Sequence, residues 1–72
     1  MTEGTIVSVR KGYVFIDTMQ RRGIFAHQSA FDTAVLLGEH LVGQSVSLEF
    51  EQGPRGLRAS KVWLAAEAHR AR

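Results

Sequence analysis

A chain of 72 residues without cysteine is long enough for one small domain and has no disulfide to stabilise it. Its formal net charge of +2 is by itself a weak argument for a nucleic-acid partner. No apolar run approaches the roughly 20 residues needed to cross a bilayer, and residues 1–4 lack signal-peptide character. We therefore expect a cytoplasmic protein with no membrane partner.

Five segments of the chain have the two-residue alternation or the β-branched content of strands. The predicted strands cover residues 5–9, 13–17, 24–27, 46–51 and 57–64. Residues 53–56, with proline second and glycine fourth, suit a type I turn between the last two. Hairpins join the first three predicted strands, and a long connection separates the third from the fourth. This order predicts an all-β fold, a five-stranded antiparallel barrel of the OB type.

The long connection contains two less regular segments. Ser29 and Asp32 have the serine-then-acid spacing of a helical N-cap, which predicts one short helical turn. Residues 33–42 carry apolar side chains that suit a short helix, but Gly38 interrupts them. A long loop with apolar anchors is therefore an equal alternative.

The C-terminal residues 65–72 are a basic segment rich in alanine and arginine, which we separate from the barrel domain of residues 1–64. Alanine favours helix, but the segment after Trp63 is too short for a stable isolated helix in water. Either Trp63 and Leu64 dock on the barrel, or the segment is a frayed tail. A docked Trp63 would close a gap in the core or supply an aromatic ring that the first strand lacks.

The hairpin of residues 13–17 and 24–27 has two apolar faces, although folding needs only one. The aliphatic face carries no polar atom and is the natural core face. The other face holds the candidate stacking residues Tyr13, Phe15, Phe25 and His27. An exposed aromatic cluster usually marks a binding surface, and such rings stack unpaired bases at roughly 1–3 kcal/mol each. We favour this platform over the alternative that the rings are core; for His27, capping is an equal alternative to base contact.

Basic side chains bracket these aromatic segments, whereas residues 31–52 contain acids and no lysine or arginine. A phosphate backbone would have to run over the basic parts of the chain. The candidates for attracting it are Lys11, Arg55, Arg58 and Lys61. Arg10, Arg21 and Arg22 are individually more typical of solvated turns. Contacts of this kind add affinity and salt dependence rather than sequence choice.

Four segments, in order, resemble the cold shock domain family. Lys11-Gly12-Tyr13-Val14-Phe15-Ile16 is similar to its first RNP-type motif, usually Lys-Gly-Phe-Gly-Phe-Ile. Ile24-Phe25-Ala26-His27 is similar to the second, usually Val-Phe-Val-His, and Ser29-Ala30-Phe31 to the Ser-Ala-Ile that follows. Residues 43–46 and 53–62 resemble the last two strands and their turn. The resemblance runs from about Gly4 to Val62 and implies the same barrel and the same stacking on single-stranded nucleic acid.

The chain departs from the family pattern mainly in its first strand. Val7-Ser8-Val9-Arg10 stands where the family usually has Lys-Trp-Phe-Asn, with a turn about two residues shorter, so Ser8 replaces a main stacking tryptophan. Val14 replaces a glycine, and Gln28 replaces a frequent aromatic residue. If each lost stack removes roughly 1–3 kcal/mol, two missing rings weaken binding by tens- to thousands-fold.

Catalysis finds little support, because His27 and Ser29 have no orienting carboxylate that we can place. The three scattered histidines make no metal site, and no cofactor motif is present.

The leading hypothesis is a non-catalytic binder of single-stranded RNA or DNA. Its role would be that of an RNA chaperone or a transcription or translation regulator, present as a monomer or weak dimer. The alternative is an adaptor that docks a protein partner through the aromatic patch or residues 36–41. A translation-factor-like protein on structured RNA has less support, because it needs more positive charge.

Overall fold

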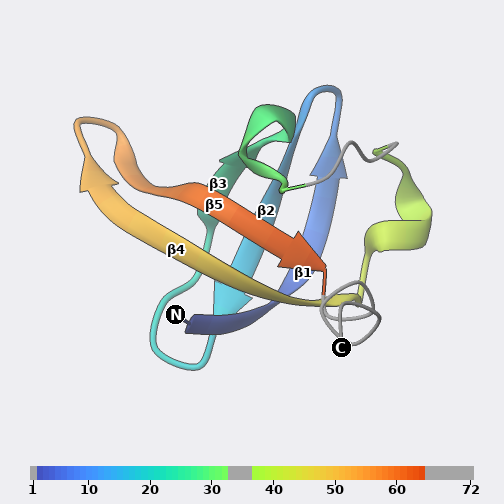
Figure 1. Cartoon of the computed structure of the whole chain (residues 1–72), viewed down its shortest axis with the longest axis horizontal. Helices are drawn as coiled ribbons and strands as arrows, with labels where there is room; N and C mark the ends of the chain where they lie inside the picture. Colours follow the sequence, from blue (N-terminus) through green and yellow to red (C-terminus); the bar gives the residue numbers. More distant parts are fainter. Residues whose placement is uncertain (1, 33–36, 65–72) are drawn as a thin grey trace.

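The computed structural model describes residues 2–32 and 37–64, which form a closed barrel of five strands (Figure 1). The strands are β1 (Thr2–Arg10), β2 (Tyr13–Thr18), β3 (Ile24–His27), β4 (Ser45–Gly53) and β5 (Gly56–Leu64). Their order around the barrel is β1-β2-β3-β5-β4. Neighbouring strands are antiparallel except β3 and β5, which run parallel, with Phe25 opposite Arg58. The predicted all-β, five-stranded barrel of OB type is confirmed.

The core lies inside the barrel and is built from the aliphatic side chains that alternate along each strand. Its largest fully buried members are Ile6, Val14, Ile16, Ile24, Val46, Leu48 and Val62. Phe31 and Leu41, from the long connection between β3 and β4, complete it. The aliphatic face of the β2–β3 hairpin therefore points inward. The alternative in which its aromatic face forms the core is wrong.

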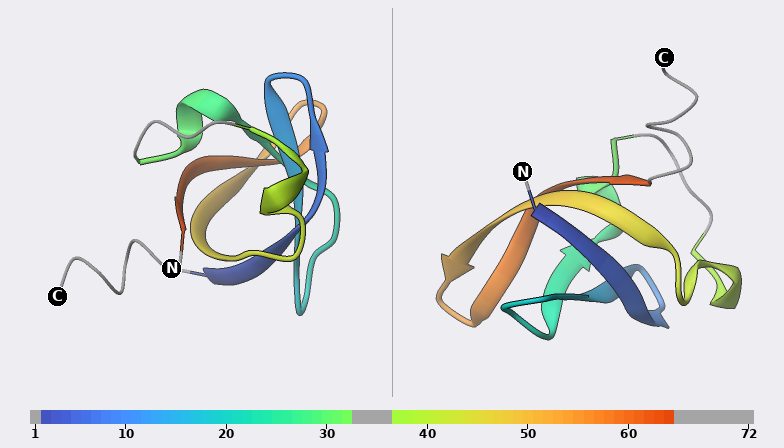
Figure 2. Two further views of the ribbon diagram at one scale, coloured as in Figure 1. Left: turned by 90° about the vertical axis from the view of Figure 1, so that its right-hand side faces the viewer. Right: turned by 90° about the horizontal axis from the view of Figure 1, so that it is seen from below.

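The strand β1 begins at Thr2, earlier than predicted, because its first residues pair with β4. Thr2 lies opposite Leu48 and Thr5 opposite Ser45, and this pairing closes the barrel (Figure 2). Gly4 belongs to this part, and a Cβ atom there would lie 2.8 Å from the carbonyl oxygen of Asp17. Glycine is a poor strand former, so local propensity gave no sign of this pairing. The close approach of β1 to β2 requires it.

Two irregularities in strand register decide which side chains face outward. In β1 the register with β2 shifts between Ile6 and Ser8, which leaves Val7 as an extra, 45% exposed residue. Residues two apart on a regular strand share a face, so without this β-bulge Ser8 would face inward with Ile6. In β5 the register with β4 skips Ser60.

The connection between β3 and β4 contains two short 3₁₀ helices, η1 (Gln28–Ala30) and η2 (Glu39–Leu41). The predicted helical turn is present, but the prediction of Ser29 as its N-cap is wrong. His27 occupies that position, because its ring nitrogen accepts the backbone N–H of Ser29. Residues 33–36 lie outside the described part, so the helix-or-loop alternatives there stay open. The C-terminal segment 65–72 also lies outside it.

Candidate nucleic-acid interface

A row of outward-facing side chains crosses the barrel from β1 to β4. Strand register places Ser8 opposite Phe15, Phe15 opposite Phe25, Phe25 opposite Arg58, and Arg58 opposite Glu51. Adjacent strands lie about 4.8 Å apart, so each side chain in this first row is within reach of the next. The row therefore joins two aromatic rings, one guanidinium group and one carboxylate group on a single surface.

A second row lies beside the first, nearer the turn between β1 and β2. Arg10 is opposite Tyr13, and Tyr13 is opposite His27. Tyr13 and Phe15 are two residues apart on β2, so both rows share one face. Arg10, which the sequence indicated as a solvated turn residue, is exposed and lies beside Tyr13. The short turn Lys11-Gly12 places it there, because a two-residue turn pairs the residues that flank it.

Three rings, Tyr13, Phe15 and Phe25, form a cluster that we call the aromatic platform. The ring centroids of Tyr13 and Phe25 are 5.0 Å apart at an interplanar angle of 35°. Phe15 meets the other two edge-on, at 5.6 Å from Tyr13 and 6.2 Å from Phe25. All three are half-buried. Such contacts hold aromatic side chains in place, so part of each ring surface is presented to solvent in a fixed orientation.

His27 ends β3 and has one ring nitrogen already engaged. Its Nδ1 accepts the backbone N–H of Ser29 at 3.1 Å and lies 2.9 Å from the Ser29 hydroxyl oxygen. Because Nδ1 accepts an N–H group, we assign the proton of the neutral ring to Nε2. The capping role that the sequence left open is therefore present. It leaves Nε2–H as a donor on an exposed side chain.

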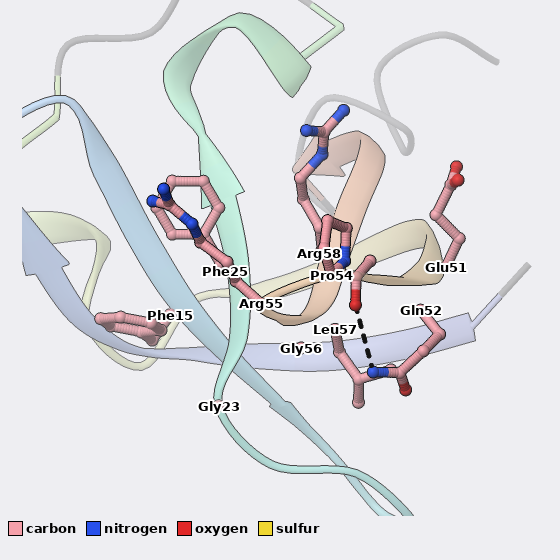
Figure 3. Close-up of a pocket in the computed structure, with 11 residues that line it drawn as sticks. Phe15, Gly23, Phe25, Glu51, Gln52, Pro54, Arg55, Gly56, Leu57 and Arg58 are labelled. Carbon is pink, nitrogen blue, oxygen red and sulfur yellow. Dashed lines mark hydrogen bonds between the residues drawn. The ribbon is translucent and has the colours of Figure 1, made fainter.

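A groove of about 710 Å³ lies between the aromatic platform and the β4–β5 hairpin (Figure 3). Figure 3 shows Phe15 and Phe25 at one side of the groove and Glu51 and Gln52 at the other. The residues that line it are Phe15, Gly23, Phe25, Glu51, Gln52, Gly53, Pro54, Arg55, Gly56, Leu57 and Arg58. A smaller hollow continues from Phe25 and Arg58 past His27 and η1 to Ser60. The concave surface thus follows β5 away from the platform.

The four basic candidates occupy different parts of this surface. Arg55 and Arg58 line the groove together with platform rings. Lys11 lies in the turn that precedes Tyr13. Lys61 lies farther along β5, with its Nζ atom 5.8 Å from the ring centroid of Trp63. The structure therefore brings Arg55 and Arg58 to the platform and leaves Lys61 outside the groove.

Acidic residues of β4 lie beside this surface. Glu51 lines the groove because it pairs with Arg58 on β5. Glu49 pairs in the same way with Lys61. These carboxylates place negative charge along one side of the basic residues of β5.

Within residues 2–32 and 37–64, no group of three or more histidine, cysteine or acidic side chains is placed to hold a metal ion. In the same part of the chain, no helix is long and apolar enough to cross a membrane.

Comparison with known families identifies the fold. Residues 3–65 match the profile of the family described as the 'Cold-shock' DNA-binding domain, a nucleic-acid-binding rather than an enzyme family. A search among curated proteins found no matching relative. The match covers nearly the whole barrel and includes both segments that carry the platform. The chain therefore belongs to the cold-shock domain family.

Proposed function

We propose that this protein binds single-stranded RNA or DNA by stacking unpaired bases on the aromatic platform. The observation that carries the proposal is the position of three half-buried rings on the outer face, beside a groove lined by two arginines. Core packing does not need these rings, because the aliphatic face of the same hairpin already fills the barrel. Bases supply flat apolar partners, and the backbone supplies the negative charge that Arg55 and Arg58 attract.

His27 adds a directed contact to this surface. Its Nε2–H group is a donor, so it suits an oxygen acceptor on a base, sugar or phosphate. Lys11 precedes Tyr13 in the chain and adds positive charge at the same end of the hairpin. Lys61 extends the positive charge along β5. The proposed site residues are thus Lys11, Tyr13, Phe15, Phe25, His27, Arg55, Arg58 and Lys61.

The biological role that fits this chemistry is an RNA chaperone or a regulator of transcription or translation in the cytoplasm. Stacking depends little on base identity, because every base has a flat aromatic face. A protein that binds in this way holds many different transcripts unpaired. Occupation of bases that would otherwise form hairpins is therefore the proposed mechanism.

The test is a fluorescence-anisotropy titration of labelled heptathymidine and heptauridine at low and moderate salt. Phe25→Ala should weaken binding roughly 5- to 150-fold, because one stack contributes about 1–3 kcal/mol. Met19→Ala is the matched control, because it removes an apolar side chain that is fully exposed in the β2–β3 loop. It should leave the affinity unchanged.

A second candidate, a protein-interaction adaptor, is favoured by one observation. Ser8 occupies the end of the first row, opposite Phe15, where the family usually presents a stacking tryptophan. Fewer rings weaken nucleic-acid binding and leave the platform available as an apolar docking surface. If the folded wild-type protein shows no saturable binding at low salt, the nucleic-acid proposal fails and the adaptor becomes the better explanation.

A further inference from the structure

Trp63 is the one tryptophan of the chain, and the alternation of β5 places it on the outer face of the strand. Its neighbours in the strand are the buried Val62 and Leu64, which packs against the core. Across the sheet it is opposite Ser47 of β4, and Ser47 is opposite Glu3 of β1. Trp63 therefore does not fill a gap in the core. It also does not replace the ring missing at Ser8, which lies opposite β2 rather than β4.

The surroundings of Trp63 resemble those of the platform rings in three respects. The ring is half-buried, as Tyr13 and Phe25 are. Its register partner on β4 is a small serine, which contributes no large side chain to cover the ring. A cation lies over the ring, because Nζ of Lys61 is 5.8 Å from the ring centroid in a cation–π arrangement. A base that stacks on this face must therefore displace Lys61 or share the face with it. An aromatic face beside a basic group is the combination that holds a nucleotide in single-strand binding sites.

The strand β5 connects Trp63 to the platform. Arg58 lies next to Phe25, and the hollow between β3 and β5 extends from these residues to Ser60, which precedes Lys61. Arg58 and Trp63 are opposite Glu51 and Ser47 of β4, which are four residues apart because the register skips Ser60. The span is therefore about 13 Å at a rise of about 3.3 Å per residue. That length corresponds to about four nucleotides stacked as in a duplex strand, and to fewer in an extended one. A strand longer than the platform can therefore reach Trp63.

Acidic residues along this path limit the number of phosphate contacts that a bound nucleic-acid strand can make. Glu51 is opposite Arg58, and Glu49 is opposite Lys61. On the other side of β5, Asp32 lies beside Val62, whose carbonyl oxygen accepts its backbone N–H at 2.8 Å. Acids thus flank the basic residues of β5, and Lys61 is the cation near the ring. A base stacked on Trp63 should gain its affinity from the ring and at most one phosphate contact.

We propose that Trp63 and Lys61 form a distal stacking subsite for the same single strand, reached from the platform along β5. The inference rests on the proposed function, because the platform must hold the first bases. It assigns to β5 a contact outside the groove, and it makes the binding site longer than the three-ring platform. Oligonucleotide length is therefore the variable that tests it.

Tryptophan emission reports directly on this subsite, because position 63 is the sole tryptophan. Binding of dodecathymidine should quench the emission, whereas tetrathymidine should bind the platform, measured by anisotropy, without quenching. Trp63→Ala should weaken dodecathymidine binding roughly 5- to 150-fold and leave tetrathymidine binding unchanged. Trp63→Phe keeps a ring and should restore part of the loss. The salt slope should steepen by no more than about 0.7 with length, equivalent to one phosphate.

The outcomes separate this inference from the proposed function. Suppose that both oligonucleotides bind and Phe25→Ala weakens both, while tryptophan emission and the Trp63→Ala affinity do not change with length. The distal subsite is then excluded and the platform stands. If neither oligonucleotide binds the folded wild-type protein, both proposals fail. Thermal melts of the two Trp63 variants show whether a loss reflects unfolding, and the wild-type emission experiment remains decisive if Trp63→Ala does not fold.

Discussion

Replacing Ser8 with tryptophan should add a fourth ring to the aromatic platform. Ser8 lies on the outer face, opposite Phe15, at the β1 end of the first row. With a strand spacing of about 4.8 Å, an indole at this position can contact the Phe15 ring and extend its surface. One added stack contributes about 1–3 kcal/mol, so the affinity for a single strand should rise roughly 5- to 150-fold.

The assay is the anisotropy titration with labelled heptathymidine at one fixed salt concentration. Ser45→Trp is the matched control, because Ser45 is exposed on β4 opposite Thr5 and lies in neither row. It adds the same ring to the barrel away from the platform and should give no comparable gain. Thermal unfolding of both variants checks that each retains the wild-type fold.

The outcome that would contradict this reasoning is a folded Ser8→Trp variant that binds with wild-type affinity. Such a result would mean that the bound strand does not pass over the β1 end of the first row. The sequence departure at Ser8 would then have no bearing on affinity. It would also remove the one observation that favours an adaptor function.

Three further results are expected. Arg58→Ala should lower the salt slope of oligonucleotide binding by about 0.7, whereas Arg21→Ala, in the β2–β3 loop, should leave the slope unchanged. Gly4→Ala should lower the free energy of unfolding by about 1–3 kcal/mol in denaturant melts, because its Cβ would lie 2.8 Å from the Asp17 carbonyl oxygen. His27→Ala should destabilise η1 by about 1 kcal/mol through loss of its cap, and His27→Asn should recover stability without recovering binding if the ring contacts nucleic acid.

The number of strands and the identity of the core face could be predicted from sequence because both depend on a local pattern. Val14 and Ile16 alternate with Tyr13 and Phe15, and the aliphatic pair has no polar atom to leave unpaired. The structure buries that pair completely. Alternation with a period of two residues shows the core face of a strand without information on which strands lie beside it. The outward position of the aromatic platform is therefore the part of the candidate site that could be predicted from sequence.

The partners of each strand could not be predicted in the same way, because they depend on long-range register. The pairing of Thr2–Thr5 with β4 includes Gly4, whose propensity argues against a strand. The parallel pairing of Phe25 with Arg58 joins segments that are distant in sequence. Glu51 lies beside Arg58 through the antiparallel pairing of β4 with β5. The sequence named Phe25 and Arg58 as candidates but did not show that they are neighbours, because no local pattern shows which strand lies beside which.

The bulge at Val7 explains why Ser8 faces outward at the position where the family usually has a stacking tryptophan. It turns Ser8 outward beside Phe15, so the backbone presents this position on the same face as the aromatic platform, without a ring. At the other side of the platform, β5 carries Arg58 and Lys61 on its outer face, followed by Trp63. Aromatic surface is therefore reduced at the β1 end and present beyond the β5 end. A strand bound to this barrel should extend toward β5, where its remaining aromatic surface and its cations lie together.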